Sequence, residues 1–302
     1  MKKIVDGILF DGQFVVDAWD VRTWRANGVM ERSCRQVVEW TEIGPATSPM
    51  SWEDYIAQFD YDPAKQKRLE AERLLEIEEK HQRSLKKSAQ RAKQMCRRVI
   101  ISENFDELLT LTYRENQLDR DLCKKHFKEW VRRMKRALPG FRYCASFERQ
   151  ERGSMHVHLA TRKLPTHADY KGVKVKAWEL GTKVWRSVVG ADNGLCHVGA
   201  KTRFGSSRRS RLSLSKMASY VSKYIMKDYE DAPESSNRYS RSDGNPVAKP
   251  EVMRFSNCSL FDLIVLTFEQ GEGDMVVSHR IGHFKDSLWL CTERDISRVV
   301  HV

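Results

Sequence analysis

The sequence predicts an α+β protein in which helices pack on a central antiparallel sheet, and three observations lead to this class. Between residues 99 and 226 the pattern runs strand, helix, strand, strand, helix, strand, helix. The expected strands at 141–150 and 154–163 are separated only by a short polar turn, which is typical of a hairpin. Residues 63–98 contain no glycine and open with a proline, which predicts one long helix.

Four segments follow from changes in composition along the chain. They are an N-terminal accessory segment (1–62), the long charged helix (63–98), a main domain (99–245) and a β-rich C-terminal accessory segment (246–302). In the last segment, the apolar runs 261–268 and 274–278 are expected to be strands joined through a glycine-rich turn. The stretch 231–250 is rich in proline, serine and asparagine, which indicates a loop.

Within the main domain, apolar residues at helical spacing predict a helix that begins near Asp119 and ends at Pro139. A second helix is expected at 175–189, a strand at 195–199 and a third helix at 215–226. The order of the strands in the sheet does not follow from these patterns.

The composition narrows the class of partner. The 302 residues carry a formal net charge of +12 and a pI near 9.4, which favours a polyanion. Neither a signal segment nor a membrane span is expected, and seven scattered cysteines indicate neither a disulfide framework nor a zinc finger. A reducing cytoplasm is therefore the expected location. The long helix has twelve basic and five acidic residues, which fits either a solvated helix or an arm that binds DNA or a partner.

A histidine pair is the first candidate site. His156 and His158 are two apart on an expected strand, so both imidazoles project from one face. Glu148 on the preceding strand can lie opposite them, and Glu151 is the second choice because it falls in the turn. Two imidazoles and a carboxylate leave coordination positions open, which predicts a catalytic Mg²⁺ or Mn²⁺ ion. The alternative is two solvent-facing histidines without a metal.

A tyrosine cluster is the second candidate site. Tyr220 and Tyr224 are four apart and share one helical face, with Lys223 and Lys227 one step round the helix. An apolar stripe should hold this helix to the sheet and leave the tyrosines on an accessible face; it consists of Met217, Val221 and Ile225. A phenol with an ordinary pKa of about 10 needs nearby positive charge to act as a nucleophile. The alternative is that the tyrosines are packing residues of the core.

The stretch 201–227 has eight basic residues and no acidic one, which favours contact with the phosphates of a polyanion. The phosphate contacts expected there are Arg203, Arg208, Arg209, Arg211 and Lys227. A solvated loop is the alternative.

Together these patterns resemble the HUH endonucleases, specifically the two-tyrosine rolling-circle replication initiators of single-stranded phages and plasmids. The resemblance covers residues 99–245, about half of the chain. It is carried by LLTLTY at 108–113, MHVHL at 155–159 and YVSKYIMK at 220–227, which correspond to the family's first, histidine and tyrosine motifs. The bracketing of a lysine by two tyrosines is the most specific of the three.

The resemblance implies a mechanism. The divalent ion would be bound by Glu148, His156 and His158. Tyr220 would attack the scissile phosphate, which leaves a 5′-phosphotyrosine and a free 3′-hydroxyl. Tyr224 would make the second attack, and Lys223 would steady the developing charge. The order of attack by the two tyrosines stays open.

The implied partner is single-stranded or hairpin origin DNA, together with a host polymerase. A host helicase is also expected, because the sequence has no GxxxxGK[ST] loop for a fused one. A relaxase or transposase of the same superfamily and a non-enzymatic DNA-binding regulator are the alternatives. The origin sequence and the oligomeric state are not predicted.

Overall fold

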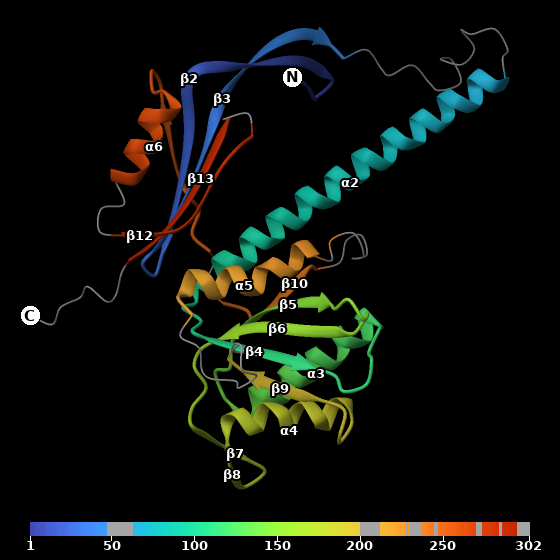
Figure 1. The fold of residues 1–302 in the computed structure, drawn as a ribbon, viewed down its shortest axis with the longest axis vertical. Helices are drawn as coiled ribbons and strands as arrows, with labels where there is room; N and C mark the ends of the chain where they lie inside the picture. Colours follow the sequence, from blue (N-terminus) through green and yellow to red (C-terminus); the bar gives the residue numbers. More distant parts are fainter. Residues whose placement is uncertain are drawn as a thin grey trace, which may run out of the picture. The chain divides into compact units, whose positions relative to one another are not determined.

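The structure is a computed structural model that describes residues 1–46, 63–199, 212–227, 229, 237–244, 247–269, 274–283 and 286–294. The chain forms two compact units (Figure 1). The flanking unit combines Met1–Gln82 with Ala248–Val302, and the central unit spans Arg83–Val247. Helices and mostly antiparallel strands make up both units, which confirms the α+β class. No helix in the described parts of the chain has the length and hydropathy needed to cross a lipid bilayer.

One antiparallel sheet, ordered β1-β2-β3-β13-β12 with β11 also paired to β2, forms the flanking unit. Its strands are β1 (Lys2–Val5), β2 (Ile8–Ala26), β3 (Val29–Pro45), β11 (Glu251–Phe255), β12 (Asp274–Ile281) and β13 (Ser287–Arg294). The N-terminal and C-terminal accessory segments therefore share one sheet, in which β13 lies between β3 and β12.

Helix α6 (Leu260–Glu269) occupies the apolar run 261–268, so the strand expected there was wrong. The side chain of Ser259 accepts a hydrogen bond from the backbone N–H of Asp262 at 3.2 Å, and the Asp262 carboxylate accepts one from the Ser259 N–H at 3.1 Å. This reciprocal pair is a capping box, which starts a helix. An apolar run of this length fits a strand or a buried helix, and the S-x-x-D start decides between them.

The central unit contains a five-stranded antiparallel sheet of order β10-β5-β6-β4-β9 (Figure 1). These strands are β4 (Glu107–Thr112), β5 (Tyr143–Arg149), β6 (Met155–Thr161), β9 (Leu195–Val198) and β10 (Tyr239–Arg241). The helices are α3 (Arg120–Ala137), α4 (Ala177–Val189) and α5 (Leu214–Lys227), and a separate hairpin is formed by β7 (His167–Tyr170) and β8 (Val173–Lys176). The predicted order of elements is thus confirmed.

Three local expectations in this unit were incomplete. Helix α2 (Pro63–Ser102) continues past residue 98, because Val99, Ile100 and Ile101 are buried and gain more from packing than from a strand conformation. The β7–β8 hairpin occupies part of a stretch for which no strand was expected. Strand β10 falls in the expected loop, where it pairs with the edge of β5.

Helices pack on both faces of the central sheet. On one face, the hydroxyl of Ser146 donates a 2.6 Å hydrogen bond to the Val221 carbonyl of α5. On the other face, the ring of Phe147 packs edge-on against Phe127 of α3, with the ring centroids 5.6 Å apart. Because Ser146 and Phe147 are neighbours on one strand, α5 and α3 cover opposite faces.

The capping box makes helix α6 testable. The change Ser259→Ala should lower the free energy of unfolding by about 1 kcal/mol, because the N–H of Asp262 loses its side-chain acceptor. Urea titration measures this change, and Ser256→Ala, three residues before the capping serine, is the matched control with no expected effect. Equal stability of the two variants would contradict the capping role.

Candidate functional site

The pairing of strands β4, β5 and β6 brings the predicted metal ligands together. Glu148 of β5 is directly opposite His156 of β6, and His158 is opposite Ser146 of β5 and Thr110 of β4. Residues paired directly in an antiparallel sheet project from the same face. The hairpin register therefore puts one carboxylate and two imidazoles on the face that α5 covers.

These three residues form the metal-binding candidate of the described part of the chain. One ligand atom from each of Glu148, His156 and His158 lies within 4.8 Å of the other two. Their exposed fractions are only 7%, 8% and 4%, so the alternative of two solvent-facing histidines was wrong. Glu151, the second choice for the carboxylate, is exposed in the turn. A buried set of two nitrogens and a carboxylate could hold a divalent cation.

The carboxylate of Glu148 is shared between two donors. Nε2 of His158 lies 2.8 Å from Oε2, and Nζ of Lys227 donates to Oε1 at 2.7 Å. On its other side, Nδ1 of His158 lies 3.2 Å from the hydroxyl of Thr110. In the neutral ring, donation from Nε2 to the carboxylate leaves Nδ1 to accept from Thr110. Hydrogen bonds on both sides thus orient this imidazole.

Burial and hydrogen bonding set the protonation states. Burial lowers the pKa of His158, and this outweighs the opposite effect of the neighbouring Glu148 carboxylate, so the ring is neutral. Burial by itself would raise the pKa of Glu148, but the hydrogen bonds from His158 and Lys227 lower it to about 2. A neutral imidazole beside an ionised carboxylate is the combination that a divalent cation requires of its ligands.

Helix α5 lays both tyrosines against His158. The ring of Tyr224 stacks on the imidazole with centroids 4.0 Å apart and planes 10° apart, whereas Tyr220 meets it edge-on at 5.8 Å. Nζ of Lys223 lies 4.4 Å and 4.7 Å from the ring centroids of Tyr220 and Tyr224. The three side chains predicted to carry the chemistry thus lie together beside the candidate ligands.

The two tyrosines differ in environment. We expected both on an accessible face, and for Tyr224 this was wrong, because its exposed fraction is only 6%. Stacking on His158 turns it inward, and burial together with the neighbouring Tyr220 hydroxyl raises the pKa of its phenol. Tyr220 is half-buried and keeps partial access to solvent. The apolar stripe of Met217, Val221 and Ile225 is buried, as predicted.

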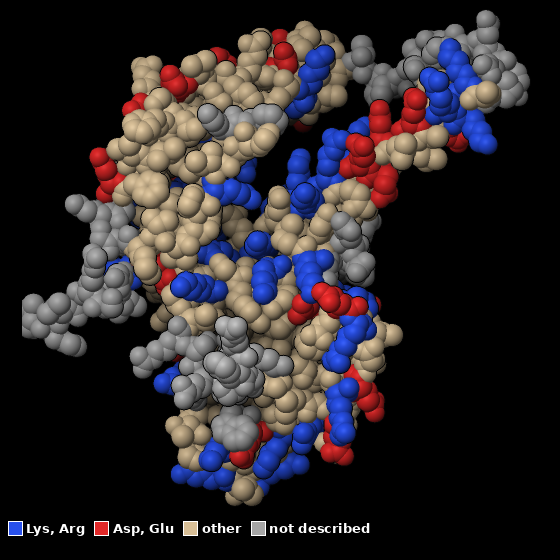
Figure 2. Space-filling view, viewed as in Figure 1, with Lys and Arg blue, Asp and Glu red and all other residues tan. Residues whose placement is uncertain are grey.

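The expected DNA contacts have different outcomes. Arg203, Arg208, Arg209 and Arg211 lie outside the described residues. Lys227, also expected to contact phosphate, pairs with Glu148 beside the candidate metal site, and its contact with DNA stays a prediction. Figure 2 shows lysine and arginine side chains over the region of α5, the helix that carries Lys216, Lys223 and Lys227.

Two residues of the site were not predicted from the sequence. Thr110 belongs to the LLTLTY motif, which by composition was only a good central strand, but it orients His158. Ser146 has an exposed fraction of 0% and holds α5 to the sheet through the Val221 carbonyl. In each case the signal was a hydroxyl between two apolar neighbours, because a polar group among buried residues must find a hydrogen-bond partner.

A match to a family of known proteins covers much of the central unit. Residues 106–229 match the model of the replication-associated protein ORF2 family. This segment contains all three motifs, from β4 to the end of α5. The match supports a replication-associated protein, of the rolling-circle initiator kind that the motifs resemble. No curated protein and no solved structure matches the chain.

The lowered pKa values predict acid instability of the metal-free protein. Both groups lose a proton more readily when folded, so the stability they contribute is present at neutral pH and is lost on acidification. For Glu148, the loss falls between its ordinary pKa of 4.5 and about 2, and it is on the order of 3 kcal/mol. Urea titrations from pH 7 to pH 2.5 measure it.

The variant Glu148→Gln supplies the comparison for this loss. It should be less stable than the wild type at pH 7, and the difference should narrow as the pH falls, because the amide does not titrate. A difference in stability that stays constant with pH would contradict the assigned ionisation of Glu148.

Proposed function

We propose that this chain is a metal-dependent endonuclease that nicks single-stranded origin DNA through a tyrosine and so starts rolling-circle replication. One observation carries the proposal: Tyr220 and Tyr224 both contact His158, which shares a buried cluster with His156 and Glu148. The match of residues 106–229 to a replication-associated family supports the same function independently of side-chain geometry.

The ligand set fits a divalent cation in its chemistry as well as in its spacing. Glu148 already accepts hydrogen bonds from a lysine ammonium and an imidazole, so this buried carboxylate attracts positive charge. His156, His158 and Glu148 would hold Mg²⁺ or Mn²⁺, which would polarise a phosphate oxygen when bound. The hydroxyl of Thr110 can donate to Nδ1 of His158 or accept from it, so it orients the ring in either tautomer.

Tyr220 is the proposed first nucleophile, because its hydroxyl is the more accessible of the two. Its oxygen forms a bond to the scissile phosphorus, and the bond from phosphorus to the 3′ oxygen breaks. The phenol proton ends on the departing 3′ oxygen, which leaves a 3′-hydroxyl for a host polymerase. The phosphotyrosine keeps the energy of the phosphodiester, so no nucleotide cofactor is needed for religation.

Tyr224 is the proposed second nucleophile, which would close the replicated circle by attacking a second scissile phosphate. Its buried ring is held on His158, and its raised pKa keeps the phenol protonated until DNA is bound. The ammonium of Lys223 lies over both rings and would stabilise negative charge on either phenol oxygen or on the phosphate. Host helicase would separate the strands.

The metal site is testable by calorimetry without any DNA. Titration of the wild type with Mn²⁺ should show one site, and His158→Ala should abolish it. Thr110→Val should weaken binding by about tenfold to a hundredfold, because the imidazole loses the partner that orients it. His167→Ala removes an exposed histidine of β7 and should bind as the wild type does. Unchanged binding by His158→Ala would contradict the ligand set.

Adduct formation tests the tyrosine chemistry. A 3′-labelled single-stranded origin oligonucleotide with Mn²⁺ should label the wild-type protein covalently, because the tyrosine keeps the 5′ phosphate. Tyr220→Phe should lose more adduct than Tyr224→Phe, and the double variant should lose all of it. Tyr170→Phe changes a tyrosine of β7, outside this cluster, and is the control.

Three other outcomes would point elsewhere. An adduct in the double variant would exclude these two tyrosines as the nucleophiles. DNA binding by the wild type without any adduct would favour a non-enzymatic regulator. A larger loss in Tyr224→Phe than in Tyr220→Phe would reverse the proposed order of attack.

A further inference from the structure

Helix α3 carries a dense positive charge that the nicking chemistry does not use. Its 18 residues include eight lysines and arginines and two acidic residues. Glu129 accepts hydrogen bonds from Arg132 and Arg133, each at 2.7 Å, so its single negative charge compensates one of these two positive charges. Lys128 is exposed and forms no ion pair with a described residue. Nζ of Lys124 lies 3.8 Å from Oδ1 of Asp121, which is a long distance for an ion pair. The two lysines are four apart and therefore share one helical face.

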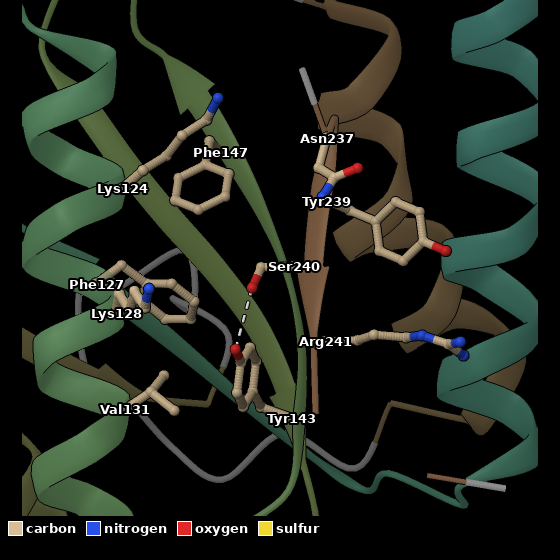
Figure 3. A pocket seen from close by; sticks show the side chains of 10 residues that line it. All are labelled: Lys124, Phe127, Lys128, Val131, Tyr143, Phe147, Asn237, Tyr239, Ser240 and Arg241. Atoms are coloured by element: carbon tan, nitrogen blue, oxygen red, sulfur yellow. Dashed lines mark hydrogen bonds between the residues drawn. The ribbon is translucent and has the colours of Figure 1, made fainter. Parts of the chain in front are cut away.

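A groove lies beside these two lysines, between α3 and strand β10 (Figure 3). Its volume is about 670 Å³, within the range of about 300–1,000 Å³ that small-ligand pockets occupy. The side chains of Phe127, Tyr143 and Phe147 form an apolar floor. Figure 3 shows Lys124 and Lys128 on the helical side, opposite Ser240, whose hydroxyl lies 3.0 Å from that of Tyr143. The groove thus has a cationic rim and an aromatic floor.

The position of the groove connects it with the candidate active site. Strand β10 is the edge of the central sheet in the described residues, and its only neighbour, β5, carries Glu148. Phe147 and Glu148 are adjacent on β5, so one faces the groove and the other faces the tyrosine helix. A chain that leaves the active site therefore has to pass only the edge strand to reach the groove, because neighbouring strands are about 4.8 Å apart.

The edge strand itself is suited to that path. Figure 3 shows the side chains of Tyr239 and Arg241 on the side of β10 away from α3, whereas Ser240 points toward α3. Arg241 is exposed, and Tyr239 is half-buried. A polyanion that wraps this edge would therefore meet a guanidinium on the face of α5 and two ammonium groups on the face of α3.

We infer that the groove between α3 and β10 binds a stretch of single-stranded DNA continuous with the strand in the active site. The phosphates lie on Lys124 and Lys128, and a base enters against the aromatic floor. Single-stranded DNA fits better than duplex, because the bases of a duplex are stacked inside it and cannot reach an apolar floor. The identity of the polyanion rests on the proposed function, whereas the location does not depend on the nicking chemistry.

Salt-dependent binding tests this inference. The double variant Lys124→Gln and Lys128→Gln should bind a 30-nucleotide single strand more weakly, and the slope of log affinity against log salt should fall by about 1.4, since each lost contact contributes about 0.7. The matched control, Lys174→Gln and Lys183→Gln, removes two exposed lysines on β8 and α4, and α4 packs on β9 at the other edge of the sheet. It should keep the wild-type slope.

Two further experiments distinguish failure of the groove inference from failure of the proposed function. The wild type should form the covalent adduct with a 30-nucleotide strand that carries the nick site. Absence of adduct from the wild type would contradict the proposed function, whereas the salt slopes of binding would still test the groove. A duplex of 30 base pairs should bind the wild type and the double variant with the same slope. If the single-strand slope is unchanged, or if only the duplex slope falls, the inference is overturned.

Discussion

The carboxylate of Glu148 is the interaction on which the arrangement of the site depends. It joins three elements, because it lies on β5 and accepts from His158 of β6 and from Lys227 of α5. An ionised group with an exposed fraction of 7% must be paired and hydrogen-bonded to be tolerated. The distance between the tyrosine helix and the histidine strand is therefore set by the same carboxylate that would hold a cation. Ser146 adds a second tether from β5 to α5.

The stacking of Tyr224 on His158 gives the two tyrosines different roles in the resting site. One phenol is buried with a raised pKa, and the other is half-buried beside it at a ring separation of 5.5 Å. Two successive transesterifications need two nucleophiles that are not consumed together. In the proposed function, an accessible tyrosine and a sheltered one, with Lys223 over both, would meet that requirement within one turn of helix.

The two faces of the central sheet carry different kinds of residue: candidate site residues on one face and apolar core residues on the other. Alternate residues of β5 point to opposite faces, so Glu148 and Ser146 serve the site while Phe147 and Tyr143 pack toward α3. In the described residues, the short strand β10 forms one edge of this sheet, and a bound chain could pass round it from one face to the other. A single strand of DNA that rounds this edge would use the positive charge of α3, which otherwise has no evident role in a helix whose buried side is already apolar.

Periodicity is a local property, so the amino-acid sequence alone predicts which residues share a face. The alternation of a strand puts His156 beside His158, and the helical repeat puts Tyr220 beside Tyr224, so the candidate ligands and nucleophiles were predicted. The three-dimensional contacts were needed to choose Glu148 over Glu151, to bury Tyr224 and to pair β13 with β3. The choice of Glu148 depends on the register of the hairpin, and the other two outcomes depend on contacts between residues distant in sequence. No local pattern of hydropathy encodes such pairings.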